Sequence, residues 1–105
     1  MRMSSEIESS GSCDTAESEK YGFPPDYKVI LLNDDFTTKE FVVEILTQVF
    51  QKTMEEAVEI MEKVHKSGRG VAGVYTIDVA FSRVRLTHLL AKKRNYPLRC
   101  IVEQC

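Results

Sequence analysis

The adjacent prolines at positions 24 and 25 divide the chain into two parts of different composition. Each proline disfavours a helical backbone in the residue before it, so we expect no helix to cross this point. The 25 residues up to Pro25 include six serines, and their two basic and five acidic side chains give a net charge of −3. Such a segment buries too little apolar surface to offset the entropy lost on ordering. The sequence therefore predicts a disordered N-terminal extension over residues 1–25 and a folded domain over residues 26–105.

Composition narrows the kinds of partner that this domain can take. The whole chain has 14 basic and 16 acidic side chains, whereas a nucleic-acid-binding domain needs a surplus of cations to neutralise phosphates. No apolar run approaches the ~20 residues of a membrane-spanning helix, and no apolar segment follows Arg2 as it does in a secretory signal. The three cysteines lack the paired spacing of a zinc site. We therefore expect a cytoplasmic protein that binds no nucleic acid, membrane, metal or cofactor.

The first part of the domain is predicted to be a strand followed by two helices. Residues 27–32 (YKVILL) form a short, β-branched and mainly apolar run, which indicates a buried strand. Thr37 begins a T-x-x-E capping box that predicts a helix start. Thr53 begins another, and Gly68 is expected to end that second helix. Apolar residues recur at helical spacing in both: Phe41, Val42, Ile45, Leu46, Val49 and Phe50, then Met54, Ala57, Val58, Met61 and Val64.

The rest of the domain is predicted to be strand, helix and strand. Residues 71–77 have the composition of a strand, with Gly73 leaving room for another backbone to pass closely. Thr76 or Asp78 is expected to cap a third helix, and residues 98–102 alternate as a final strand. The apolar face of that helix is expected to comprise Val79, Ala80, Val84, Leu86, Leu90 and Ala91. The order β-α-α-β-α-β predicts an α+β fold, with a small antiparallel three-stranded sheet and three helices packed on one face.

Residues 33–37 (NDDFT) are the most unusual segment, because two carboxylates and an amide directly follow a buried strand. Ionised carboxylates only accept hydrogen bonds, and an Asn side-chain oxygen also accepts them, so this cluster suits a cation with several N–H donors, such as a primary ammonium. An Asx turn leading into a capped helix explains the same residues without a ligand. His65 extends the apolar face of the second helix, where it could accept from an ammonium or bond a helix-end carbonyl.

An enzyme is the main alternative from another functional class. A small metal-dependent or acid–base enzyme would use Asp34, Asp35 and His65, whose side chains are ordinary metal ligands and proton carriers. No second histidine with fixed ligand spacing, nucleophile elbow or phosphate-binding glycine loop accompanies them. His88 has no apolar neighbours in the sequence that stand out, and it is assigned no role.

Three runs of the sequence resemble one known family. Pro24-Pro25 followed by YKVILLNDDFT, then MEKVHKSGRGVAGVYT, and then YPLRCIVE are similar in order and spacing to ClpS, the adaptor that brings N-degron substrates to the Clp AAA+ protease. The resemblance covers residues 24–104 and implies that residues 26–105 are an N-degron-binding adaptor domain without catalytic activity. Such adaptors bind a free N-terminus whose first residue is Leu, Phe, Tyr or Trp. A ubiquitin-ligase module with a related fold is a third reading, but this chain lacks the length for ligase machinery.

The resemblance also implies roles for individual residues. Asn33, Asp34 and His65 match the family positions that hold the α-ammonium of the bound N-terminus. Asp35 and Thr37 match neighbours that support the pocket and the peptide backbone. The pocket around the first side chain is implied to comprise Val42, Met61, Val64 and Leu98, with Lys39 at its rim.

The implied partner is the N-terminal domain of a Clp unfoldase, usually ClpA. Asp78 and Arg83 match polar positions that contact this domain in the family, and the extension matches one that the unfoldase pore engages during hand-over. Lys39 replaces a usual Met that helps to reject β-branched first residues, so the replacement bears on discrimination against Ile and Val. We expect the protein to be a monomer.

Overall fold

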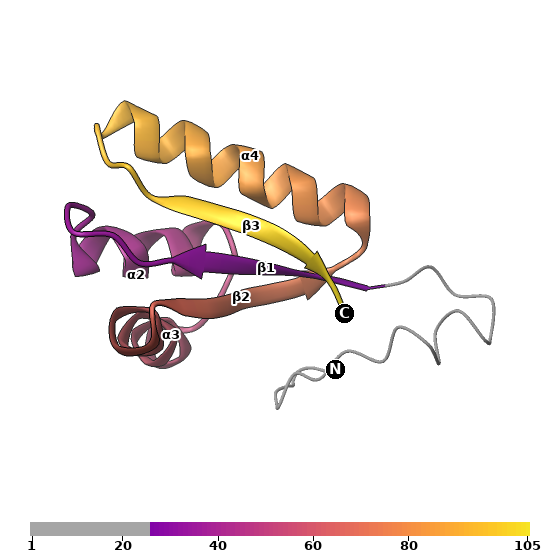
Figure 1. Ribbon diagram of the computed structural model, residues 1–105, viewed down its shortest axis with the longest axis horizontal. Coiled ribbons are helices and arrows are strands. Elements are labelled where there is room, and N and C mark those ends of the chain that lie inside the picture. Colours follow the sequence, from indigo (N-terminus) through magenta and orange to yellow (C-terminus); the bar gives the residue numbers. More distant parts are fainter. Residues whose placement is uncertain (1–25) are drawn as a thin grey trace.

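Three strands and three helices alternate along residues 26–105, the part of the chain that the structure describes (Figure 1). In this computed structural model the order along the chain is β1 (Tyr27–Leu32), α2 (Lys39–Gln48), α3 (Met54–Ser67), β2 (Arg69–Tyr75), α4 (Ile77–Lys93) and β3 (Arg99–Gln104). The predicted order β-α-α-β-α-β and the α+β class are confirmed. The predicted disordered extension, residues 1–25, lies outside the described residues.

The strands form one antiparallel sheet in the order β2-β1-β3, with β1 in the centre. A central strand has neighbours on both sides, which explains why the first predicted run is apolar almost throughout. Val29, Ile30 and Leu31 are all buried. Val29 lies opposite Gly73 of β2, but the register shifts at the next residue, so Ile30 lies opposite Val71.

All three helices pack on one face of the sheet, as predicted (Figure 1). Val29 and Leu31 of β1 point to this face and join a single apolar core. The helices contribute Phe41, Val42, Ile45 and Leu46 from α2, Ala57, Met61 and Val64 from α3, and Ala80 and Ala91 from α4. Burying these side chains is the main force that holds the helices on the sheet.

The other face of the sheet carries an ion pair instead of a helix within residues 26–105. Arg69 of β2 lies opposite Leu32, and Glu103 of β3 lies opposite Lys28, so the two residues are diagonal to each other across β1. Their side chains meet at 2.9 Å. Ile30 of β1, between Lys28 and Leu32, is only 1% exposed.

Helix α2 begins one residue later than the predicted capping box implies. Thr38, not Thr37, is the N-cap residue, and its hydroxyl accepts a hydrogen bond from the N–H of Phe41 at 3.1 Å. The hydroxyl of Thr37 donates instead to Oδ2 of Asp34 at 2.7 Å. The predicted box from Thr37 to Glu40 is therefore wrong, because a nearby carboxylate binds that hydroxyl and the next threonine caps the helix.

Both predicted ends of α3 are confirmed. The N–H of Thr53 donates to Glu56 and the N–H of Glu56 donates to the Thr53 hydroxyl, which completes the capping box. Gly68 ends the helix with a φ of 88°, a left-handed conformation that favours glycine. A Cβ atom on the following Gly70 would lie 2.8 Å from Cγ2 of Val64, so glycine at this position lets β2 pass close to α3.

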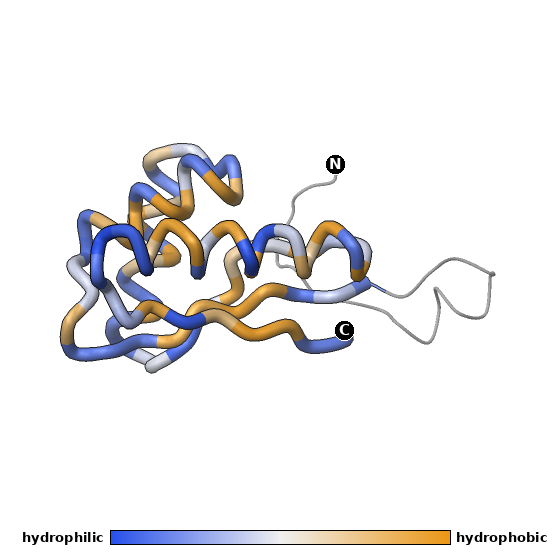
Figure 2. Tube along the Cα trace, turned by 90° about the horizontal axis from the view of Figure 1, so that it is seen from above, coloured by the Kyte–Doolittle hydropathy of each residue, from blue (hydrophilic) through white to orange (hydrophobic). Residues whose placement is uncertain are grey.

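The buried side of α4 differs from the predicted apolar face. Of the six predicted residues, Ala80 and Ala91 are buried and Val84 and Leu90 partly buried, but Val79 and Leu86 are exposed. Thr87 is buried instead, and its hydroxyl donates to the carbonyl of Arg83 at 2.8 Å, which satisfies the polar group. Hydrophobic residues recur all along α4 (Figure 2). Periodicity alone therefore does not identify which side of the helix packs on the sheet, and in the structure that side carries small residues.

The strands flanking α4 also differ from prediction at their ends. β2 begins at Arg69 and ends at Tyr75, since Thr76 is the N-cap residue of α4 and Asp78 lies in its first turn. β3 covers residues 99–104. The space beside Gly73 is filled by the ring of Tyr75 and not, as predicted, by another backbone; an aromatic side chain two residues along the same strand covers the glycine.

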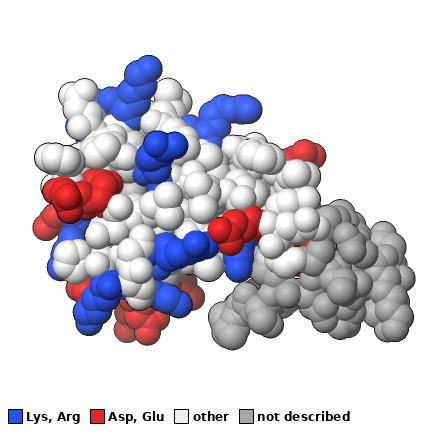
Figure 3. Space-filling model, in the orientation of Figure 1, with Lys and Arg blue, Asp and Glu red and all other residues white. Residues whose placement is uncertain are grey.

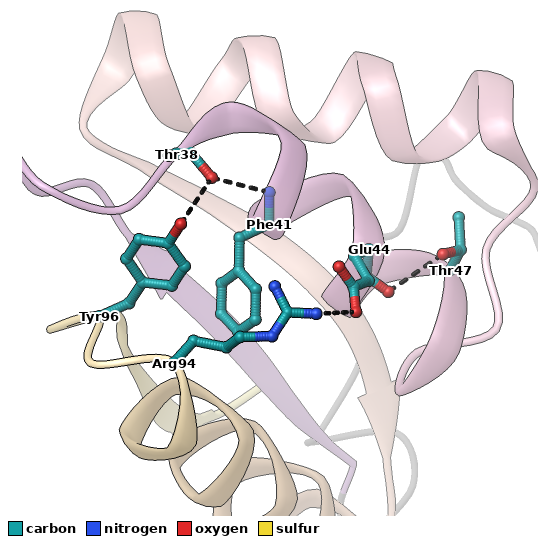
Figure 4. Close-up of polar contacts among 6 residues, drawn as sticks. All are labelled: Thr38, Phe41, Glu44, Thr47, Arg94 and Tyr96. Carbon is teal, nitrogen blue, oxygen red and sulfur yellow. Dashed lines mark hydrogen bonds and ion pairs between the residues drawn. The ribbon is translucent and has the colours of Figure 1, made fainter.

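The turn between α4 and β3 is fixed against the start of α2 (Figure 4). The rings of Tyr96 and Phe41 pack with centroids 4.8 Å apart. The Arg94 guanidinium lies over the Phe41 ring, 5.4 Å from its centroid, and pairs with Glu44 at 2.9 Å. The Thr38 hydroxyl also lies 3.5 Å from that of Tyr96. These contacts hold the first turn of α2, which borders the candidate site.

Candidate functional site

Nine side chains line a hollow of about 230 Å³. The chain segments that carry them meet at the left end of the molecule in Figure 1. They come from the loop between β1 and α2, the first part of α2 and the C-terminal half of α3: Asn33, Asp34, Asp35, Thr37, Lys39, Val42, Met61, Val64 and His65. The structure thus brings together every residue predicted for the peptide-binding pocket except Leu98. Leu98 is buried and lines a second hollow, at the turn between α4 and β3.

The carboxylate of Asp34 organises the loop that forms one wall. The N–H groups of Phe36 and Thr37 donate to its Oδ1 at 2.8 and 2.6 Å, and the Thr37 hydroxyl donates to its Oδ2. This is the Asx-type turn that the sequence also predicts. Burial has the largest single effect on the pKa of Asp34 and would raise it, but the three hydrogen bonds together hold the pKa below its usual range. Asp34 is therefore ionised at neutral pH.

Asn33 and His65 supply further acceptors beside Asp34. The N–H of Asn33 donates to the carbonyl of Gly68 at 3.0 Å, which ties the end of β1 to the end of α3, where His65 lies. Both side chains are exposed at the hollow, and within residues 26–105 neither makes a hydrogen bond. The Asn33 amide oxygen and the ring of His65 are thus available to a ligand with N–H donors, since an imidazole nitrogen without a hydrogen accepts hydrogen bonds.

Part of the lining of the hollow is apolar. Val42, Met61 and Val64 are buried members of the core that also line the hollow, whereas Lys39 is exposed at its rim. A volume of about 230 Å³ is smaller than the ~300–1,000 Å³ of pockets that hold drug-sized ligands. The hollow therefore suits a single hydrophobic side chain, with an attached ammonium directed toward the acceptors.

The residues of the enzyme alternative lie in the same hollow. Asp34, Asp35 and His65 all line it, but among residues 26–105 no three His, Cys, Asp or Glu side chains form a group that could hold a metal ion. A Cys–His contact lies elsewhere, with Cys100 Sγ 3.7 Å from His88 Nε2. Burial raises the pKa of the Cys100 thiol to about 11, so at neutral pH it is the weakly nucleophilic neutral form.

Two residues near these hollows were not singled out by the sequence. Phe36 lies between two lining residues of the first hollow and is 76% exposed, more than any other large hydrophobic residue described. The sequence does contain a signal for Phe36, because an aromatic residue is unusual within a polar segment that belongs to no helix or strand. His88 accepts a hydrogen bond from the N–H of Cys100 and so ties α4 to β3. No local pattern indicates that contact, because the two residues meet only after the chain turns.

Comparison with known proteins identifies the family. Residues 23–101, most of the chain, match the family described as ATP-dependent Clp protease adaptor protein ClpS. The chain belongs to the ClpS family. The ATP-dependent Clp protease adapter protein ClpS of Lawsonia intracellularis is 49% identical over 98 residues, covering 93% of this chain and 90% of that protein. The ClpS of Acetivibrio thermocellus is 54% identical over 80 residues, covering 76% of this chain and 81% of that protein.

A solved ClpS structure has the same fold. ClpS2 of Agrobacterium tumefaciens bound to L-phenylalaninamide is similar with a TM-score of 0.75 and 34% identity, covering 78% of this chain and 99% of that one. As a ClpS family member the chain is an adaptor of the Clp protease, and its relatives are named adaptors and not enzymes. No helix in residues 26–105 is long and apolar enough to span a membrane.

Proposed function

We propose that this ClpS family member binds proteins whose first residue is Leu, Phe, Tyr or Trp, through the free α-amino group, and delivers them to a Clp unfoldase–protease. The observation that carries the proposal is the hollow itself. Acceptors on Asn33, Asp34 and His65 lie beside an apolar wall within one small volume. Such a site is complementary to a hydrophobic side chain whose own Cα carries a charged amine.

Each part of the hollow has a role in this proposal. The α-ammonium donates to Asn33, to ionised Asp34 and to a ring nitrogen of His65, while Asp35 and Thr37 support the loop and the peptide backbone. The hydrophobic side chain packs on Val42, Met61 and Val64; Leu98 remains a predicted member of this wall. The ligand of the Agrobacterium ClpS2 supports these assignments, because L-phenylalaninamide combines a benzyl side chain with a free α-amine.

The energetics require both halves of the ligand. Burying a Phe or Leu side chain contributes about 1.5–3 kcal/mol, and a hydrogen bond to a charged group contributes about 1.5–3 kcal/mol. Micromolar affinity needs about 8 kcal/mol. The side chain alone falls short of this value, so the amine has to supply much of the binding free energy.

Peptide binding measured by fluorescence anisotropy tests the proposal. A peptide with N-terminal Phe should bind without added metal, whereas the same peptide acetylated at its amine, or with Phe moved to position two, should show no measurable binding. Equal binding of the acetylated peptide would overturn the proposal. Binding that a chelator abolishes would instead support a metal-dependent enzyme.

Lys39 gives the rim of the hollow its own test of specificity. Its aliphatic stem can cover apolar surface while its ammonium stays in water, so it does not reproduce the shape of a Met side chain. We compare the affinity for peptides with N-terminal Ile or Val with the affinity for a Phe peptide. This ratio should be higher in the wild-type protein than in a Lys39→Met variant. An unchanged ratio between the two proteins would show that position 39 does not set this discrimination.

Delivery is proposed to use the start of α4. Asp78 is exposed in the first turn, and Arg83 is partly buried with its guanidinium carbon 5.7 Å from the centroid of the Tyr75 ring. Asp78→Ala and Arg83→Ala should weaken binding to the N-terminal domain of a ClpA-like unfoldase while leaving peptide affinity unchanged. Arg85→Ala, at an exposed position of the same helix, is the matched control. Full binding by both variants would exclude this surface.

A further inference from the structure

The second hollow, at the turn between α4 and β3, has a volume of about 550 Å³, and of its lining residues only Leu98 has been assigned to another site. It is lined by His88, Ala91, Lys92, Asn95, Tyr96, Pro97, Leu98 and Arg99. Ala91, Pro97 and Leu98 supply apolar surface. The charged side chains are both cations, and none of these lining residues carries a carboxylate.

The polar groups of this hollow are suited to donate hydrogen bonds. Lys92 and Arg99 are exposed and, within residues 26–105, form no ion pair. Nε2 of His88 accepts the N–H of Cys100 at 3.1 Å, so the hydrogen of the neutral ring is on Nδ1, which is a donor. Figure 3 shows Lys and Arg side chains spread over this face of the molecule, including its upper part, where α4 and β3 lie. The hollow therefore favours an anion with an aliphatic part.

The two hollows are neighbours at one end of the molecule. The loop after β1 and the turn before β3 both lie at the left end in Figure 1. Thr37 and Lys39 line the first hollow, and Thr38, between them, lies with its hydroxyl 3.5 Å from that of Tyr96, which lines the second. A polypeptide that leaves the first hollow across Thr38 therefore reaches the second hollow at Tyr96.

We propose that the second hollow is a subsite for acidic side chains that follow the first residue of a substrate polypeptide. This inference rests on the proposed function, because the first residue has to occupy the first hollow. The carboxylate of a Glu side chain pairs with Lys92 and Arg99, and its methylene groups lie on the exposed ring of Pro97. Substrates with an acidic segment near the N-terminus are then bound in preference to neutral ones.

The direct test compares two peptides that both begin with Phe. One carries Glu at positions three to six and the other carries Gln there; an extended block of four residues spans about 13 Å, enough to extend beyond the rim of the first hollow. The Glu peptide should bind about threefold to tenfold more tightly at low salt, since exposed ion pairs contribute modestly. The advantage should shrink as salt is raised.

Variants assign the effect to this hollow. Lys92→Gln combined with Arg99→Gln should remove the advantage of the Glu peptide and leave the affinity of the Gln peptide unchanged. Both side chains are exposed, so the fold should be retained, and circular dichroism checks this. Lys93→Gln is the matched control, because Lys93 is exposed on the same helix but does not line the hollow.

The outcomes separate the two proposals. If the Gln peptide fails to bind the wild-type protein, the proposed function is wrong and the subsite falls with it. If the Gln peptide binds and Glu brings no advantage, or if the advantage survives in the double variant, only the subsite is overturned. Equal binding of the acetylated Glu peptide would make the hollow an independent anion site and would also overturn the subsite.

Discussion

Asp34 combines two tasks in a single side chain. Its three hydrogen bonds from Phe36 and Thr37 shape the loop after β1, and the same bonds hold its pKa low, so a negative charge stays at the hollow. Burial opposes this charge. The Asx turn and the ammonium site are therefore compatible readings of one residue, because the donors that fix the turn also stabilise the ionised form.

Replacing Thr37 tests this coupling at the scale of one residue. Thr37→Val removes the hydroxyl that donates to Asp34 at 2.7 Å, and a lost hydrogen bond to a charged group costs about 1.5–3 kcal/mol. We expect the affinity for an N-terminal Phe peptide to fall about tenfold, measured by anisotropy. Thr37→Ser keeps the hydroxyl and should bind like the wild type. Undiminished binding by Thr37→Val would show that this bond does not support the site.

At the scale of elements, two glycines place α3 against β2. Gly68 ends the helix with a positive φ, and Gly70 lets the strand pass close to Val64, which lines the hollow. The helix also carries Met61 and His65 to the same hollow. The position of half the site therefore depends on how closely one strand and one helix approach.

Gly70→Ala should disturb both stability and binding. The added Cβ would lie 2.8 Å from Cγ2 of Val64, and overpacking of this kind costs about 1–3 kcal/mol. Urea unfolding measures that loss, and peptide affinity should fall several-fold as Val64 moves into the hollow. Gly68→Ala is the control, because its strained φ destabilises the fold while the added Cβ meets nothing within 4 Å. Equal affinities of the two variants would contradict a role for Val64 packing.

At the scale of the whole molecule, two carboxylates make the stability of the fold depend on pH. The pKa of Glu56 is lowered, mainly by the hydrogen bond from the Thr53 N–H in the capping box of α3, and the pKa of Asp34 is lowered too. A carboxyl group whose pKa is lower in the folded than in the unfolded chain stabilises the fold at higher pH. That stabilisation is present above the unfolded pKa, about 4, and is lost as the pH falls through the folded value.

We therefore expect the free energy of unfolding to decrease as the pH is lowered from about 5 to about 3. Urea unfolding at a series of pH values measures this. Asp34→Asn and Glu56→Gln each remove one titrating group, so each variant should show a weaker pH dependence than the wild type. If both variants lose stability at low pH as steeply as the wild type, other groups cause the pH dependence.

Local chemistry explains why much of the fold and of the candidate site can be predicted from sequence. The bounds of β1 follow from one apolar run, and the capping box and Gly68 mark both ends of α3, since each signal acts within a few residues. Residues 33–37 (NDDFT) likewise indicate a cluster of hydrogen-bond acceptors, because these side chains are adjacent in the sequence. Where local signals compete, prediction fails: Thr37 and Thr38 both can cap a helix, and only the side chain of Asp34 decides between them.

Local sequence patterns predict the elements, their order and a cluster of hydrogen-bond acceptors after β1. They do not predict which distant residues meet, because that depends on packing. Packing of α3 on β2 brings His65 to Asn33 and Asp34, and the turn before β3 places Leu98 in a second hollow with Lys92 and Arg99. The side of α4 that is buried was likewise settled by Ala80 and Thr87 against the sheet. Periodicity and capping act over a few residues, whereas these contacts join segments that the whole fold brings together.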